Sequence, residues 1–534
     1  MHEILMLCLG LILSVSFLVL VANKLKIAYP IFLVIAGLGA GFIPGIPGIH
    51  IDPDLVFLVI LPPILFDAAQ NTSWKALWKW RRIITVMALG YVLLTATAVA
   101  FVSYALIPGF TLAQGFLLGA IISPPDAAAA TSVLQFVKMP KSMVSILEGE
   151  SLLNDATSLT LFRFALAAII SSNFSWFNAA SGFIFVTVSG IGIGLILGLI
   201  FYAIYKWLPT TSNLDIAFSL VLPYIMYITA EELHSSGVLA VVTGSLFISY
   251  KNHFVLTHSS RLRSNAVWPS IVFILNAVVF FVIGLQLPDI VSGIKSEFLL
   301  DAFKIALIIT AVVIVIRMLS GWFSSWFTSF ISKYITVAAS KPGWRNPTIV
   351  SWVGMRGVVS LASALSIPLL VNNHAFPNRN LILFITFIVI VVTLVCQGLT
   401  LPWLIRRLKP ENITDEKEDD QQTLEIELQL LTVAVDKINN DYPADLKVNR
   451  LLQNKLEVLK YKVELYGSSV NNTRKKVSAN KLIERFKLVM TDVIEHERSK
   501  LHTFRKKDEY DDDIIRLIEN RLDLEEEGLK EDSE

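Results

Sequence analysis

The sequence predicts an all-α polytopic membrane protein, with about thirteen transmembrane helices followed by a helical tail. The chain has 534 residues, of which 54% are hydrophobic and only 17% are charged, and its mean hydropathy is +0.61. These values lie outside the range of soluble domains. The apolar content ends near Leu408, and the residues after it are charged and amphipathic. We therefore divide the chain into a membrane domain, 1–408, and a soluble tail, 409–534.

Each predicted span is a run of apolar residues, and a helix needs about 20 of them to cross the hydrocarbon core. The first run has no basic region before it and no cleavage site after it, so we expect it to remain as a span rather than to be cleaved as a signal peptide. The predicted spans are 4–22, 28–43, 54–70, 83–107, 112–137, 143–171, 179–206, 214–231, 237–250, 266–287, 301–330, 347–370 and 381–405.

The basic residues of the loops support this division and predict an orientation. If the loops alternate between the two sides, one set contains nearly all the Lys and Arg residues, and the other contains only Lys295 and Arg379. Cytoplasmic loops carry the excess of positive charge in most membrane proteins. We therefore expect the basic loops and the tail to be cytoplasmic, with the N-terminus outside.

Two of the predicted spans are interrupted near their centres. The span 112–137 contains Ser123-Pro124-Pro125-Asp126, whose prolines remove two backbone donors, and the span 347–370 contains Gly354-Met355-Arg356-Gly357. Freed backbone groups at membrane depth are tolerated where they line a polar cavity or are buried in protein. These spans are the fifth and the twelfth, and they correspond if the first six and the last six spans form two inverted repeats. Such a pair indicates a binding site near the bilayer midplane.

Asp126 and Asp155 are the main candidate site residues. A charge inside a span is costly, so an intramembrane carboxylate is by default a functional candidate. Ser151 and Asp155 are four residues apart and therefore share one helix face. Together with carbonyls freed by Pro124 and Pro125, they offer hard oxygens to a monovalent cation, or a carboxylate to a proton. Cation and proton would then compete for one site, whereas the simpler alternative is a pair of carboxylates that only brace helices.

Other polar residues in the spans are expected to support this site. Asp67 lies near the cytoplasmic end of the third span, where it is either interfacial or functional. Glu150 and Arg356 are expected to form a buried ion pair, since a lone charge there would be very costly. Asn154 is expected to orient neighbouring groups or to serve as a packing amide. Arg317 is expected to snorkel or to brace a helix.

The tail is expected to form several soluble helices. It opens with an acidic run, 415–420, and continues with apolar residues at helical spacing, such as Ile514, Ile515, Leu517, Ile518 and Leu522. A regulatory or dimer-contact role and a plain solvated appendage are both open. The histidines and the two cysteines show no metal-ligand spacing. We expect no cofactor and no nucleic-acid partner.

The motifs around these residues resemble the cation:proton antiporter family that includes the sodium/proton exchangers, and especially its bacterial members with a cytoplasmic tail. The matching runs lie in the expected order over most of the membrane domain. They are Leu61-Pro62-Pro63-Ile64-Leu65-Phe66, Ser123-Pro124-Pro125-Asp126, Gly149-Glu150-Ser151-Leu152-Leu153-Asn154-Asp155-Ala156 and Gly354-Met355-Arg356-Gly357-Val358-Val359-Ser360.

The resemblance implies a homodimer in the cell membrane, each protomer having a dimerisation domain and a mobile core domain with two crossed broken helices. It implies that Asp155 and Asp126 bind Na⁺ or a proton, that Ser151 assists, and that Glu150 pairs with Arg356. The implied activity is antiport of Na⁺ or Li⁺ against H⁺, contributing to pH homeostasis, and not an enzymatic reaction.

Three positions bear on the details of that activity. Asn154 is the residue found in electroneutral members of the family. Pro125 replaces a threonine of many relatives, which leaves only its backbone carbonyl as a ligand. Asp67 replaces a glutamate of some relatives, and its shorter side chain leaves the choice among Na⁺, Li⁺ and K⁺ open. A K⁺/H⁺ antiporter is the alternative within the class, and an intramembrane aspartyl protease or a passive cation channel are the alternatives outside it.

Overall fold

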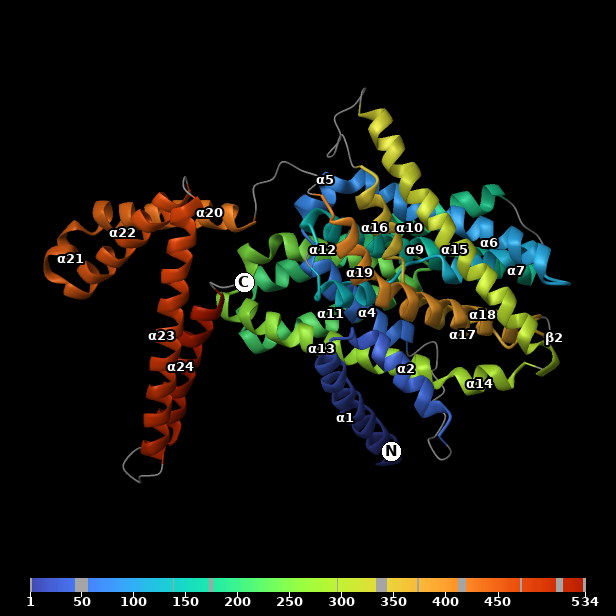
Figure 1. Cartoon of the computed structure of the whole chain (residues 1–534), viewed down its shortest axis with the longest axis horizontal. Coiled ribbons are helices and arrows are strands. Elements are labelled where there is room, and N and C mark those ends of the chain that lie inside the picture. The colour runs from blue at the N-terminus through green and yellow to red at the C-terminus, as the bar shows by residue number, and fades with distance from the viewer. Residues whose placement is uncertain are drawn as a thin grey trace. The chain divides into compact units, whose positions relative to one another are not determined.

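The computed structural model describes residues 2–43, 56–137, 139–171, 176–294, 296–332, 343–371, 374–411, 419–470, 473–505 and 512–531. The chain divides into two compact units, 1–414 and 415–534. Helices make up nearly all of the described part of each unit, as the ribbons of Figure 1 show.

The described residues of the first unit form helices and one pair of antiparallel strands of two residues each. Its elements are α1 (His2–Leu25), α2 (Tyr29–Gly41), η1 (Val56–Ile60), α4 (Leu61–Asn71), α5 (Trp74–Thr85), η2 (Val86–Tyr91), α6 (Val92–Leu106), α7 (Leu112–Ile122), α8 (Ala127–Leu134), α9 (Lys141–Ser171), α10 (Trp176–Trp207), α11 (Ser212–Glu232), α12 (Gly237–Val255), α13 (His258–Leu285), α14 (Leu287–Ser292), α15 (Ser296–Ile331), α16 (Arg345–Trp352), α17 (Val358–Leu365), β1 (Leu370–Val371), β2 (His374–Ala375), α18 (Arg379–Val392), η3 (Thr393–Gln397) and α19 (Gly398–Leu408).

Nine helices in the described residues are long and apolar enough to cross a membrane, and three shorter apolar helices accompany them. This confirms an all-α polytopic membrane protein. The predicted boundary that differs most from the structure is the start of the span 83–107, because the continuous helix already begins at Trp74. The basic residues of α5 lower the hydropathy there, but Ser73 caps the helix by accepting a hydrogen bond from Ala76 N at 3.3 Å.

Both predicted interruptions are present, and they contact each other. Helix α7 ends at Ile122 and α8 begins at Ala127, while α16 ends at Trp352 and α17 begins at Val358. The backbone N–H of Asp126 donates to the carbonyl of Met355 at 2.7 Å. One break thus satisfies a backbone group of the other, as backbone freed at membrane depth requires.

Small residues hold α7 close to its neighbour α6. A Cβ at Gly119 would overlap the backbone of Ala96, and one at Gly115 would overlap that of Ala100. Close approach of this kind is typical of helix pairs in membranes. The packing fixes the end of α7, and with it the position of the first break.

The second unit is helical in its described residues, with α20 (Asp419–Asp441), α21 (Pro443–Val448), α22 (Arg450–Val470), α23 (Thr473–Arg505) and α24 (Asp512–Glu531). Helices α23 and α24 share an apolar core that includes Ile494, Ile515 and Leu522. Of the apolar residues noted in the sequence, Ile514 and Leu517 are exposed. They lie on the opposite face because a helix repeats every 3.6 residues.

Candidate functional site

The two predicted carboxylates, Asp126 and Asp155, line a single cavity of about 410 Å³ in the first unit. Ser151, Pro125 and Asp67 also line this cavity. The walls come mainly from α4, α8, α9, α13 and the start of α17. The structure therefore brings together five predicted site residues that lie on three different predicted spans.

Asp126 lies where two half-helices begin. Its Oδ1 accepts hydrogen bonds from Ala128 N at 2.8 Å and from Ala129 N at 3.3 Å, so it caps α8. Its Oδ2 lies against Gly357, where a Cβ would overlap the carboxylate. Gly357 is the residue before α17. The positive ends of two helix dipoles therefore face this carboxylate and stabilise its charge.

Ser151 and Asp155 extend the site along α9. Ser151 Oγ accepts a hydrogen bond from Ala127 N at 3.3 Å, which links α9 to the first residue of α8. Asp155 lies one turn further along and is 8% exposed. Its carboxylate makes no hydrogen bond or ion pair with the part of the chain that the structure describes. A carboxylate this deeply buried and unpaired needs a bound proton or cation to offset its desolvation.

Asp67 and Asn154 lie in different surroundings. Asp67 Oδ1 accepts a hydrogen bond from Asn71 Nδ2 at 3.1 Å in the wall of the cavity. Asn154 is fully buried and does not line the cavity, and its amide has no hydrogen-bond partner within the described ranges. The expected orienting role of Asn154 therefore has no contact to support it.

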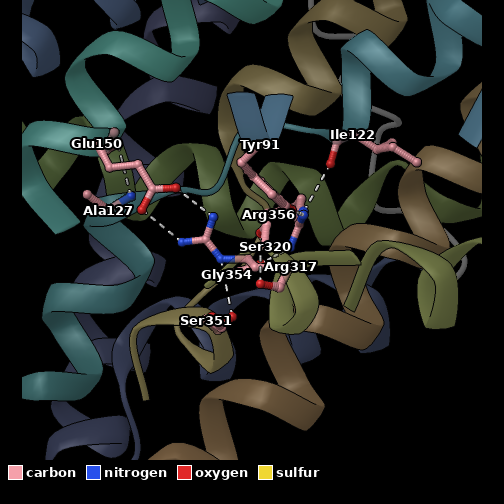
Figure 2. A network of polar contacts seen from close by, with 10 residues as sticks. Tyr91, Ile122, Ala127, Glu150, Arg317, Ser320, Ser351, Gly354 and Arg356 are labelled. Atoms are coloured by element: carbon pink, nitrogen blue, oxygen red, sulfur yellow. Dashed lines mark hydrogen bonds and ion pairs between the residues drawn. The ribbon is translucent and has the colours of Figure 1, made fainter. Parts of the chain in front are cut away.

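The expected ion pair between Glu150 and Arg356 is wrong, because Glu150 pairs with Arg317 instead. Figure 2 shows Arg317 donating to both carboxylate oxygens, from Nη1 to Oε1 at 2.6 Å and from Nη2 to Oε2 at 3.0 Å. Both side chains are 1% exposed. The planar guanidinium matches the carboxylate in this bidentate geometry. Of the two expectations for Arg317, snorkelling to an interface is therefore wrong, and bracing a helix is confirmed.

Arg356 is bound by carbonyl groups at the ends of two half-helices. Its Nε donates to Ile122 O at 3.0 Å, and an Nη donates to Gly354 O (Figure 2). Ile122 ends α7, and Gly354 lies two residues beyond the end of α16. The Arg356 guanidinium thus compensates the negative ends of two half-helices, α7 and α16. The Asp126 carboxylate compensates the positive ends of the other two, α8 and α17, in the same way.

Tyr91, which the sequence analysis did not single out, connects the two arginines. Its hydroxyl accepts a hydrogen bond from Arg356 Nη2, and its ring centroid lies 4.7 Å from Cζ of Arg317 (Figure 2). Tyr91 ends the π-helical turn η2, a feature that often marks a functional position. Its polar hydroxyl inside an apolar span was the only signal in the sequence, and such a signal is weak.

The geometry suits reversible binding of a monovalent cation or a proton. Carboxylate and hydroxyl oxygens are hard ligands of the kind that small cations prefer, and a carboxylate can carry a proton in place of the cation. Around this polar centre, the buried arginines and Glu150 brace the broken helices. The cavity offers the oxygen ligands, and the network in Figure 2 holds the helices that carry them.

Comparison with known proteins places this chain among ion exchangers of one family. Residues 10–407 match the family described as "Sodium/hydrogen exchanger, transmembrane". An uncharacterized Na⁺/H⁺ exchanger of Mycobacterium tuberculosis is 30% identical, over 94% of this chain and 92% of that protein. The sodium, potassium, lithium and rubidium/H⁺ antiporter of Bacillus subtilis is 30% identical, over 85% of this chain and 69% of its own length.

Among solved structures, the sodium proton antiporter MjNhaP1 from Methanocaldococcus jannaschii shares the fold. The TM-score is 0.61 at 19% sequence identity, and the match covers 76% of this chain and 100% of that chain. Since the family match extends over most of the chain, this protein belongs to the sodium/hydrogen exchanger family of transmembrane proteins.

Proposed function

We propose that this protein is a secondary active antiporter that exchanges Na⁺ or Li⁺ for H⁺ across the membrane. The observation that carries the proposal is Asp155, an unpaired buried carboxylate in a cavity that Ser151 and Asp126 also line. Cation and proton compete for this carboxylate, so binding one expels the other. Alternating access of the cavity to the two sides of the membrane then couples their movements.

The surroundings of the two carboxylates support one-for-one, electroneutral exchange. The Asp126 charge is stabilised by the first turns of α8 and α17, whether or not a cation is bound. The Asp155 charge has no such compensation among the described residues. Asp155 therefore carries either one cation or one proton when the site crosses the membrane, and no net charge moves. Asp67, Ser151 and the Pro125 carbonyl complete the oxygen ligands in this proposal.

The membrane arrangement proposed with this activity has thirteen spans in two inverted repeats. The breaks between α7 and α8 and between α16 and α17 occupy corresponding places in those repeats, and their mutual contact supports a crossed pair. Residues 1–408 would contain a core subdomain and a dimerisation subdomain, and the protein would be a homodimer. The loop charges support a cell-membrane protein with the N-terminus outside and the tail 409–534 in the cytoplasm.

A K⁺/H⁺ antiporter is the second candidate, because the B. subtilis relative is named for sodium, potassium, lithium and rubidium. Carboxylate oxygens bind all of these ions, and the short side chain of Asp67 does not by itself select among them. Membership of the exchanger family gives no support to an intramembrane protease or a passive channel.

The test is proton movement in proteoliposomes containing the purified full-length protein, after addition of Na⁺, Li⁺ or K⁺ with the membrane potential held at zero. We expect Na⁺ or Li⁺ to drive proton flux, and we expect the Asp155→Asn protein to show none. Flux with K⁺ alone would establish the second candidate. Absence of flux with every cation, or dependence of the flux on membrane potential, would contradict electroneutral antiport.

A further inference from the structure

The cavity contains a carboxylate that the proposed exchange does not use. Glu148 lines it together with Asp67, Asp126 and Asp155. Lys, Arg and His are absent from the described residues that line the cavity. Glu148 itself is half-buried, and it forms no ion pair or hydrogen bond with the described chain. A half-buried carboxylate without a partner is costly, and nothing in the fold explains that cost.

Glu148 lies on the same face of α9 as Ser151 and Asp155, the part of the cavity that we call the deep site, but nearer to the start of that helix. It precedes Asp155 by seven residues, which is about 10 Å along the helix and two turns on one face. The side chains become less exposed from the start of α9 toward Asp155. Glu148 and Ser151 are half-buried, whereas Asp155 is buried. A cation that enters from the start of α9 therefore passes Glu148 before it reaches Asp155.

The other polar residues of this end mark it as the mouth of the cavity. Asn71 is the last residue of α4 and Gln135 directly follows α8, and both are exposed. Thr131 lines the wall between Gln135 and Asp126. Amides and a hydroxyl surround the mouth, and its carboxylates are Glu148, which has no partner among the described residues, and Asp67, which accepts from Asn71. Asp155, unpaired and more than nine-tenths buried, lies at the deep end.

We propose that Glu148 is an access residue, which concentrates alkali cations at the mouth and so sets the apparent affinity of the deep site. This inference rests on the proposed antiport. A cavity lined by one sign of charge and walled by apolar residues focuses its field and raises the local concentration of counter-ions. Glu148 is on α9 with the deep site but is not one of its ligands, so it affects how much cation is needed and not how fast the loaded site turns over.

The first experiment compares Glu148→Gln with the wild-type protein in the proteoliposome assay. The mutation removes one charge about 10 Å from the deep site, and we expect the KM for Na⁺ to rise about two- to tenfold with an unchanged maximal rate. The difference should shrink as ionic strength is raised with an inert salt, because the Debye length falls below about 10 Å above 0.1 M.

The KM values of Glu148→Gln and the wild-type protein are compared at alkaline pH, where protons compete weakly with the cation. Loss of a negative charge weakens proton binding at Asp155 as well as cation binding, so the two effects cancel where protons compete strongly. The other titratable groups that line the cavity are Asp67, Asp126 and Tyr29. The matched control is Asp301→Asn, which removes an exposed carboxylate of α15 that pairs with Lys304 at 3.0 Å, outside the cavity. We expect it to leave KM unchanged.

A second experiment restores the charge without the glutamate. Glu148→Cys is made in a chain whose only cysteines, Cys8 and Cys396, are replaced by alanine. A thiol reagent that adds a sulfonate should return KM toward the wild-type value, whereas one that adds a quaternary ammonium should raise KM further. This comparison is made on one folded protein, so it remains informative if Glu148→Gln folds poorly.

Each outcome decides between this inference and its alternatives. An unchanged KM in Glu148→Gln, or equal effects of the two reagents, would overturn the access role while leaving the antiport itself intact. A lower maximal rate with an unchanged KM would also overturn it, and would indicate a proton relay. Failure of the wild-type protein to exchange any cation would instead contradict the proposed function.

Discussion

Arg317 and Glu150 form a bidentate ion pair between helices α15 and α9, with hydrogen bonds of 2.6 and 3.0 Å and a separation of 167 residues in sequence. Arg317 also donates from Nε to Ser351 O at 3.2 Å, in α16. One guanidinium therefore ties the helix of the deep site to the second broken span. Glu150 is the residue before Ser151, so this pair sets the rotation of α9 about its own axis.

Replacing Arg317 by alanine should destabilise the protein by about 3–5 kcal/mol, because it leaves the Glu150 carboxylate buried without its partner. Thermal unfolding in detergent measures the change. The control is Arg163→Ala, which breaks a partly exposed ion pair with Glu231 and should cost less than about 1 kcal/mol. Equal melting temperatures for the two variants would contradict the buried pair. The double variant Arg317→Ala with Glu150→Ala should cost less than the sum of the single changes.

Tyr91→Phe should lower the free energy of unfolding by about 1.5–3 kcal/mol, the usual contribution of a hydrogen bond to a charged group. The change removes the hydroxyl that accepts from Arg356 but keeps the ring beside Arg317. Denaturation in detergent gives the value. Tyr104→Phe is the matched control, since the Tyr104 side chain is 55% exposed. A loss of stability as large in the control would show that the Arg356 contact is not its source.

Gly357→Ala should abolish transport and cost about 1–3 kcal/mol of stability, because the added methyl group would overlap the Asp126 carboxylate. The carboxylate would have to leave the N-terminus of α17. Gly192→Ala in α10 adds the same methyl group where no atom lies within 4 Å, and should be neutral. Ion-driven proton flux and the melting temperature are measured for both. Normal transport by Gly357→Ala would mean that the contact between the breaks does not matter for function.

Asp155→Asn should eliminate exchange without lowering the melting temperature. The substitution keeps the shape of the side chain but removes the group that carries cation or proton. No hydrogen bond within the described chain is lost, because the Asp155 carboxylate makes none there. Flux assays and thermal unfolding are performed on the same preparation. Exchange at the normal rate would assign the ion site elsewhere, and a marked loss of stability would indicate a bracing role instead.

Local features made much of this molecule predictable. Hydropathy placed the helices, because a span must be largely apolar. The Pro124-Pro125 and Gly354–Gly357 runs predicted the breaks, because paired prolines remove backbone donors and glycines weaken a helix. The shared helix face of Ser151 and Asp155 followed from their spacing alone. The contact between Asp126 and Gly357, by contrast, depends on how two separate spans pack.

The sequence by itself determined the class of protein and the two interruptions, and it singled out Asp126 and Asp155 as candidate site residues. Only the tertiary structure decided which arginine pairs with Glu150, that Tyr91 contacts both arginines, and that Glu148 lines the cavity mouth. The physical reason is the distance along the chain over which each effect acts. Hydropathy and helix breaking act between neighbours in the chain, whereas a buried charge is compensated by whichever group the packing of distant helices brings within hydrogen-bond distance.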